Sequence, residues 1–100
     1  MALVYITCKD KAEAKKISKY LLEKRLIACS NIFPIESMYW WKNKIVNDNE
    51  IVILAKTLNK NYETIKKEVK KLHSYEIPCI LKIDAKANEE YMKWVKEEVN

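Results

Sequence analysis

The chain has 100 residues, a formal net charge of +5, 49% hydrophobic and 33% charged residues, and no glycine. This length fits one domain, and the hydrophobic content excludes a disordered chain. No apolar run reaches the roughly 20 residues of a membrane span, and the lack of glycine excludes the glycine-rich phosphate-binding loops.

The lysines are spread over predicted helix faces among acidic residues, as in Lys66-Lys67-Glu68. This pattern is typical of a solvated, ion-paired surface rather than a nucleic-acid-binding stripe. RNA recognition by stacking would also need several aromatics on the inner strands, where Tyr5 stands alone. We expect no nucleic-acid and no membrane partner. The segment 1–6 lacks the basic flank of a signal peptide, which predicts a cytoplasmic location.

The first predicted strand is the apolar run from Leu3 to Cys8. Asp10, with Glu13 three residues later, resembles a capping box. It begins a helix predicted over Lys11–Leu26, where apolar residues recur at helical spacing.

The residues Ile27 to Ile35 are again of the β type. Pro34 has no N–H to donate to a ladder, so this strand is predicted at a sheet edge or at a bulge. A hairpin should then turn near Asn43, because asparagine tolerates positive φ. The polar segment 47–50 predicts a twist or bulge before an inner strand over Ile51–Thr57.

The two hairpin arms are long, at about 12 residues or 40 Å each at the usual strand rise. Part of the hairpin should therefore project beyond the core of one subunit. Tyr39, Trp40 and Trp41 occupy successive strand positions and cannot all face one side. We predict that other copies of the chain bury them as an interface. The alternative is that Trp94 of a third helix covers the exposed side.

The second half of the chain predicts a helix that Asn59 or Asn61 caps and that ends near His73. Its apolar stripe consists of Tyr62, Ile65, Val69 and Leu72. Residues 75–78 should be extended because residue 77 precedes a proline. A fourth strand over Cys79–Asp84 and a third helix after Asn88 follow. The order β-α-β-β-α-β-α predicts one α+β domain over residues 1–100, a ferredoxin-like antiparallel sheet with an added C-terminal helix.

Three cysteines, Cys8, Cys29 and Cys79, form no CxxC pair, so neither a disulfide framework nor a zinc knuckle is indicated. No nucleophile–base motif stands out around the single histidine, His73, and we expect no enzyme. His73 with a thiolate could hold copper or another borderline ion. The alternative interpretation is a histidine that interacts with a helix dipole or a neighbour.

The chain resembles the CutA family, the divalent-cation-tolerance proteins, over nearly its whole length. The resemblance rests on Ala28-Cys29-Ser30-Asn31-Ile32 with Pro34, Ser37 to Ile45, Lys56-Thr57, His73-Ser74-Tyr75-Glu76-Ile77-Pro78, and the late Asn88, Tyr91 and Trp94. Asn43 and Ile35 stand where the family usually has glycine. Ile6 and Leu72 stand where copper-binding relatives have a thiol and a second histidine.

This resemblance implies a ferredoxin-like homotrimer, similar in architecture to the PII signalling proteins, whose hairpins extend sheets across subunit boundaries. It also implies a cytoplasmic protein linked to metal-ion tolerance, with copper bound by some members and no established catalysis. The family's recurring residues in clefts between subunits correspond to Trp41, Lys56, His73, Tyr75 and Glu76.

We therefore expect a ligand cleft of Trp41, Lys56, Tyr75 and Glu76. The candidate metal ligands are His73, Cys8 and Cys79, with copper or another divalent ion as the possible cofactor. The leading hypothesis is a non-enzymatic trimer that binds a metal or small ligand in its clefts. The alternatives are a PII-like structural or signalling trimer that binds a protein, and an enzyme that uses Lys56, Tyr75 and Glu76.

Overall fold

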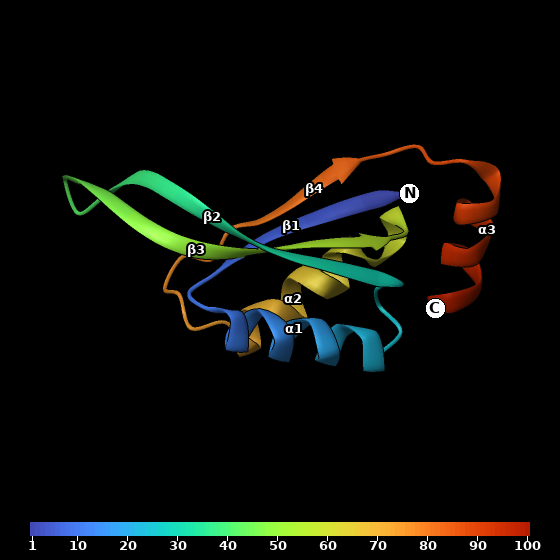
Figure 1. The fold of residues 1–100 in the computed structure, drawn as a ribbon. Coiled ribbons are helices and arrows are strands. Elements are labelled where there is room, and N and C mark those ends of the chain that lie inside the picture. Colours follow the sequence, from blue (N-terminus) through green and yellow to red (C-terminus); the bar gives the residue numbers. More distant parts are fainter.

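The computed structural model describes residues 1–100 as a four-stranded antiparallel sheet with two helices on one face and a third helix at one end (Figure 1). The elements are β1 (Ala2–Cys8), α1 (Lys11–Glu23), β2 (Cys29–Trp41), β3 (Lys44–Thr57), a 3-10 turn (Asn59–Asn61), α2 (Tyr62–Leu72), β4 (Ile80–Asp84) and α3 (Glu89–Glu98). The strand order is β2-β3-β1-β4. This confirms the predicted ferredoxin-like fold with an added C-terminal helix.

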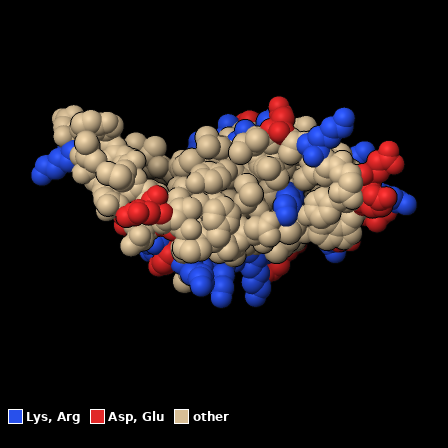
Figure 2. Space-filling model, turned by 45° about the horizontal axis from the view of Figure 1, so that its top comes forward, with Lys and Arg blue, Asp and Glu red and all other residues tan.

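The core lies between the sheet and the helices α1 and α2. Alternate β1 residues such as Val4 and Ile6 are fully buried there, packed with Ile17 of α1 and Ile65 of α2. Each such side chain contributes about 1.5–3 kcal/mol of hydrophobic stabilisation. The opposite face of the sheet carries neither α1 nor α2. Leu81 on that face is 51% exposed, and Figure 2 shows a broad surface with few charges there.

The first helix ends three residues earlier than predicted, at Glu23 rather than Leu26. Arg25 adopts a left-handed conformation with φ 59°, and its N–H donates to Leu22 O while the Leu26 N–H donates to Leu21 O. These are the two bonds of a Schellman motif. Glycine usually occupies this left-handed position. Because arginine stands there instead, the sequence lacks the residue that would have indicated the end of the helix.

The predicted helix starts are only partly capped by side chains. Asp10 accepts the N–H of Glu13, as predicted. Asn61 and Asn88 stand at N-cap positions, but neither side chain bonds to a helix N–H. The buried Asn61 amide instead donates to Thr57 Oγ1 and to two backbone carbonyls, and Asn88 donates to Glu90.

The β2–β3 hairpin is one regular ladder, from Cys29 opposite Lys56 to Trp41 opposite Lys44. The predicted bulge in the segment 47–50 is therefore wrong, although the arms twist visibly (Figure 1). β2 lies at the sheet edge, as Pro34 requires. The hairpin projects beyond the core, and the molecule measures 45 × 25 × 21 Å.

The hairpin turn consists of two left-handed residues, Lys42 (φ 49°) and Asn43 (φ 64°). A two-residue turn with positive φ at both positions is of type I′, whose twist matches that of the strands. The turn predicted at Asn43 is thus confirmed, and Lys42 shares its unusual backbone conformation.

Replacing Asn43 with Val should open the distal hairpin, because a left-handed conformation costs about 1–2 kcal/mol for a residue with a Cβ and more for a branched one. We expect faster amide hydrogen exchange at residues 41 and 44, measured by NMR. Lys42→Gly should slow this exchange. Asn47→Val, at a regular strand position, is the matched control and should leave it unchanged. Equal exchange in Asn43→Val and wild type would contradict the turn conformation.

Candidate functional site

A groove lies between the distal half of β2 and the segment that precedes β4. Its volume is about 690 Å³. The lining consists of residues 35–41 of β2, two side chains of β1, Glu50 of β3 and four residues between 75 and 79. The projecting hairpin thus forms one wall, and the segment after α2 forms the other.

A hydrogen bond between Tyr75 and Glu50 joins the two walls of the groove. The Tyr75 hydroxyl donates to Glu50 Oε2 at 2.7 Å, and Glu50 is only 7% exposed. Burial, followed by this bond to the Glu50 carboxylate, raises the pKa of Tyr75 well above its usual value. Tyr75 is therefore a neutral donor that fixes its segment onto the base of the hairpin.

Three of the four predicted cleft residues meet in this groove, namely Trp41, Tyr75 and Glu76. Lys56 does not line it. The Lys56 Nζ lies 3.9 Å from the Cys29 sulfur and 5.7 Å from the ring centroid of Tyr91, near the end of β3 away from the turn. Within one chain the predicted cleft is therefore incomplete.

The aromatic side chains of the hairpin are exposed in the single chain. Trp40 is 71% exposed, and Tyr39 and Trp41 are each more than one-third exposed. Trp94 packs on Tyr91 in α3, at the opposite end of the molecule from the hairpin tip (Figure 1). The alternative that Trp94 covers the aromatic run is wrong for the isolated chain.

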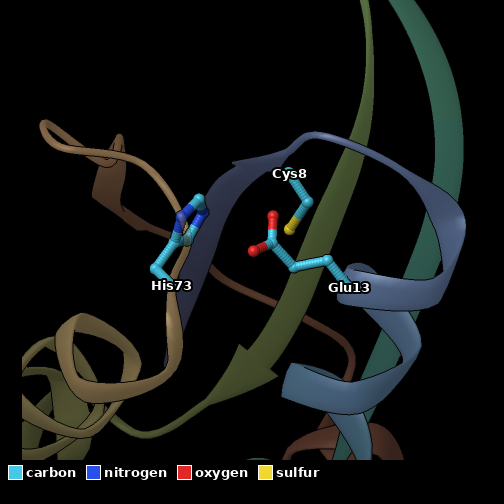
Figure 3. A group of neighbouring side chains, drawn as sticks. All are labelled: Cys8, Glu13 and His73. Atoms are coloured by element: carbon cyan, nitrogen blue, oxygen red, sulfur yellow. The ribbon is translucent and has the colours of Figure 1, made fainter.

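The predicted ligands His73 and Cys8 come together with Glu13 (Figure 3). Their donor atoms all lie within 4.8 Å of one another. Cys8 ends β1, Glu13 lies in the first turn of α1, and His73 follows α2, so three separate elements converge. Cys79 is not part of this cluster and lines the groove instead.

Both ring nitrogens of His73 are engaged. Nε2 lies 2.8 Å from the carbonyl oxygen of Thr7, and Nδ1 accepts the N–H of Tyr75 at 3.1 Å. Because a carbonyl can only accept, Nε2 carries the hydrogen and the imidazole is the neutral tautomer. This arrangement agrees with the interpretation of His73 as a residue that bonds to its neighbours.

The Glu13 carboxylate is engaged as well. Oε1 accepts the N–H of Lys9 at 3.1 Å, and Oε2 accepts the N–H of Ser74 at 2.9 Å. Burial alone would raise the pKa of Glu13, but the hydrogen bonds from Ser74 and Lys9 hold it below its usual value. Glu13 therefore stays ionised and ties the end of α2 to the start of α1.

The Cys8 thiol is buried, and burial together with the Glu13 and Glu50 charges raises its pKa to about 12. A metal ion binds the thiolate. An ion at Cys8, Glu13 and His73 would therefore have to displace backbone hydrogen bonds and remove a tightly held proton. In this conformation the donor atoms of the three side chains are already engaged or protonated, so an ion could bind only after they are released. The metal role of His73, Cys8 and Cys79 stays a prediction.

Sequence reasoning missed the roles of Glu50 and Glu13. Glu13 was identified only as part of a helix cap, and Glu50 only as part of a polar stretch. One signal for Glu50 was present, because it lies two residues before Val52 and so shares a strand face with this apolar residue. Its partner Tyr75 is 25 residues away along the chain.

The fold and the groove define a ferredoxin-like α+β protein with an extended hairpin that forms one wall of a site. None of its helices has the length and apolar character needed to cross a membrane. The family model described as CutA1 divalent ion tolerance protein matches residues 2–98. The chain belongs to this family.

Relatives from distant organisms support this assignment. The CutA protein of Thermotoga maritima is 46% identical over 99% of this chain and 99% of its own length. That of Pyrococcus horikoshii is 42% identical over 98% of this chain and 97% of its own length. A solved structure of a Pyrococcus horikoshii CutA1 variant is 42% identical, with a TM-score of 0.97, and covers 100% of this chain and 99% of that chain. The solved Archaeoglobus fulgidus protein, named a periplasmic divalent cation tolerance protein, is 41% identical, with a TM-score of 0.97 and full coverage of both chains.

Glu13→Gln should destabilise the protein by about 2–3 kcal/mol at neutral pH, because two backbone N–H groups lose a charged acceptor. The pKa of Glu13 in the folded protein lies below its usual value of 4.5. The stabilisation by the Glu13 carboxylate is therefore fully present above pH 4.5 and is lost as the pH falls through the lowered pKa. Urea unfolding curves of wild type and variant should therefore converge as the pH falls through this lowered pKa. The exposed Glu97→Gln is the control, and a difference that does not change with pH would contradict the ionised role.

Proposed function

We propose that this protein acts without catalysis, as a homotrimer that binds a small ligand in clefts between its subunits and serves divalent-cation tolerance. The observation that carries the proposal is the groove between the distal half of β2 and residues 75–79, which contains Trp41, Tyr75 and Glu76 but lacks Lys56 within one chain. A neighbouring subunit would complete the predicted cleft of Trp41, Lys56, Tyr75 and Glu76.

Three surfaces of the single chain support self-association. The hairpin exposes Tyr39, Trp40 and Trp41, and β2 is an edge strand over 13 residues. A long exposed edge with apolar side chains is a template for pairing with another chain. The sheet face away from α1 and α2 is also apolar and partly exposed. Burying these surfaces between copies would remove all three from water.

A non-catalytic role is supported by the state of the reactive groups. His73 has no free ring nitrogen, and the pKa of Cys8 is raised. Tyr75, a candidate in the enzymatic alternative, is a neutral donor to Glu50, and Lys56 lies apart from it. The PII-like alternative uses the same trimer, with a protein in place of the small ligand.

For location we keep the cytoplasm as the prediction, although the Archaeoglobus relative is named periplasmic.

Light scattering should give a mass about three times the chain mass of 11.9 kDa. Trp40→Ala should lower this mass at low micromolar concentration, because Trp40 offers the largest exposed aromatic surface of the hairpin. Leu22→Ala is the matched control, since Leu22 is exposed on α1 rather than on the hairpin. A wild-type mass near one chain would contradict the trimer.

Metal binding is the second candidate function, favoured by the convergence of Cys8, Glu13 and His73. Thiolate and imidazole donors suit copper. For this candidate, copper titration should saturate at one ion per chain, and His73→Ala should lower the affinity at least tenfold, a difference of about 1.4 kcal/mol. Cys29→Ser, outside the cluster, is the control. Unchanged affinity in His73→Ala would remove His73 as a ligand.

A further inference from the structure

The groove is acidic in a chain that is otherwise basic. The lining includes Glu50 and Glu76, with Glu36 at a β2 position that alternates with Tyr39 and Trp41, but no lysine, arginine or histidine, although the chain has 19 lysine and arginine residues and a net charge of +5. Acidic side chains are visible where the hairpin leaves the body (Figure 2). The groove is therefore a region of negative potential that attracts cations.

Glu50 is the buried centre of this charge. Its side chain is 7% exposed, the neutral Tyr75 hydroxyl is its hydrogen-bond donor, and no lysine or arginine pairs with it. Burial of a carboxylate without a cationic partner is costly. Within the chain, Glu50 lacks the counter-ion that such a position favours.

Neighbouring groups respond to the Glu50 charge. Burial first, and then the charge of Glu50, raises the pKa of Cys79. The same carboxylate contributes to the raised pKa of Tyr75. The field of Glu50 thus reaches at least two other lining residues of the groove.

Aromatic rings complete the lining. Tyr39 and Trp41 lie at alternate positions of β2 and both line the groove. Ring faces of this kind attract ammonium and guanidinium groups within about 6 Å. The chain already shows this property at its turn, where Lys42 Nζ lies 5.7 Å from the Trp41 ring centroid.

The lining favours an organic cation over a metal ion. The donor atoms that converge closely enough for coordination are those of Cys8, Glu13 and His73, and the three groove carboxylates are not among them. A hard ion such as calcium needs about six to eight oxygens at about 2.3–2.6 Å. A cavity of about 690 Å³ with one buried carboxylate and several rings is instead suited to an alkyl chain that ends in a charge.

We propose that the groove binds an organic cation, an alkylammonium or guanidinium group, with Glu50 as its counter-ion and the rings of Tyr39 and Trp41 against its alkyl and charged parts. This inference rests on the proposed ligand-binding role of the groove but not on the proposed trimer. The cation has two possible sources with the same chemistry, a free alkylamine or a lysine or arginine side chain of a second copy.

The first arm of the test uses cadaverine, a linear diamine whose alkyl chain ends in an ammonium group, as a lysine side chain does, and carries a second ammonium at its other end. Calorimetric titration should show saturable binding that Glu50→Gln weakens at least tenfold, since glutamine keeps an acceptor for Tyr75 but no charge. Glu97→Gln, an exposed carboxylate outside the groove, should bind cadaverine like wild type. Pentanol, which has no charge, should not bind saturably.

The second arm tests the lysine of another copy. A carbodiimide joins carboxylates to amines that already touch them, so it should link Glu50 to a lysine of a second chain, with the link mapped by mass spectrometry. This link should be lost in Glu50→Gln and kept in Glu97→Gln. Cadaverine binding that depends on Glu50, or an inter-chain link that depends on it, supports the inference.

The inference is overturned if neither cadaverine binding nor an inter-chain link depends on Glu50, whether because both are absent or because Glu50→Gln leaves them unchanged. The oligomeric mass is measured separately on the same samples. A monomer that binds cadaverine through Glu50 would overturn the trimer and leave the cation site standing. A trimer that shows neither cadaverine binding nor the inter-chain link would overturn the cation site and leave the trimer standing.

Discussion

The unbroken pairing of β2 with β3 is the constraint on which the rest of the structure depends. The ladder keeps one register over all 13 residues of β2, far past the part of the sheet that α1 and α2 cover. Because side chains alternate along a strand, this register decides that Tyr39, Trp41 and the buried Glu50 serve the same groove. A slip by one residue would move them to the opposite face.

The second wall of the groove is held by polar anchors rather than by apolar packing. Residues 73–75 are tied down three times, through His73 to the Thr7 carbonyl, through the Ser74 N–H to Glu13, and through the Tyr75 hydroxyl to Glu50. Buried networks of this kind are satisfied only in one arrangement, and they therefore specify geometry. The same side chains that suggest metal or acid–base chemistry in the sequence hold this segment in place.

Much of the fold could be predicted because it is encoded locally. Strand alternation and helical spacing predicted the four strands and three α-helices but not the 3-10 turn, and Pro34 and Asn43 predicted the sheet edge and the turn. The end of α1 was missed because Arg25 occupies a position where glycine would have marked it. Of the twist or bulge predicted at 47–50, only the twist is present, because polar residues also suit a regular ladder that projects into water.

The site could be predicted less completely because its contacts are long in sequence. Family resemblance identified Trp41 and Tyr75, but periodicity could not pair Tyr75 with Glu50 across 25 residues or bring Glu13 to Ser74 across 61. The engagement of both His73 nitrogens depends on the backbone around Thr7 and Tyr75. Lys56 lies near Cys29 and Tyr91 rather than in the groove, and this separation follows from strand pairing over a long sequence distance, which local patterns do not encode.

The absence of glycine has a consequence for the unfolded state. Arg25, Lys42 and Asn43 each hold a left-handed backbone that glycine would adopt without strain. Yet every position without glycine leaves the unfolded chain fewer conformations, and such a position typically favours the native state by about 0.4–1 kcal/mol where the native φ is ordinary. Backbone strain at three residues therefore opposes folding, while the lower conformational entropy of the unfolded chain at the other 97 residues favours it. Part of this protein's free energy of unfolding would then originate in the disordered chain rather than in any contact of the folded one.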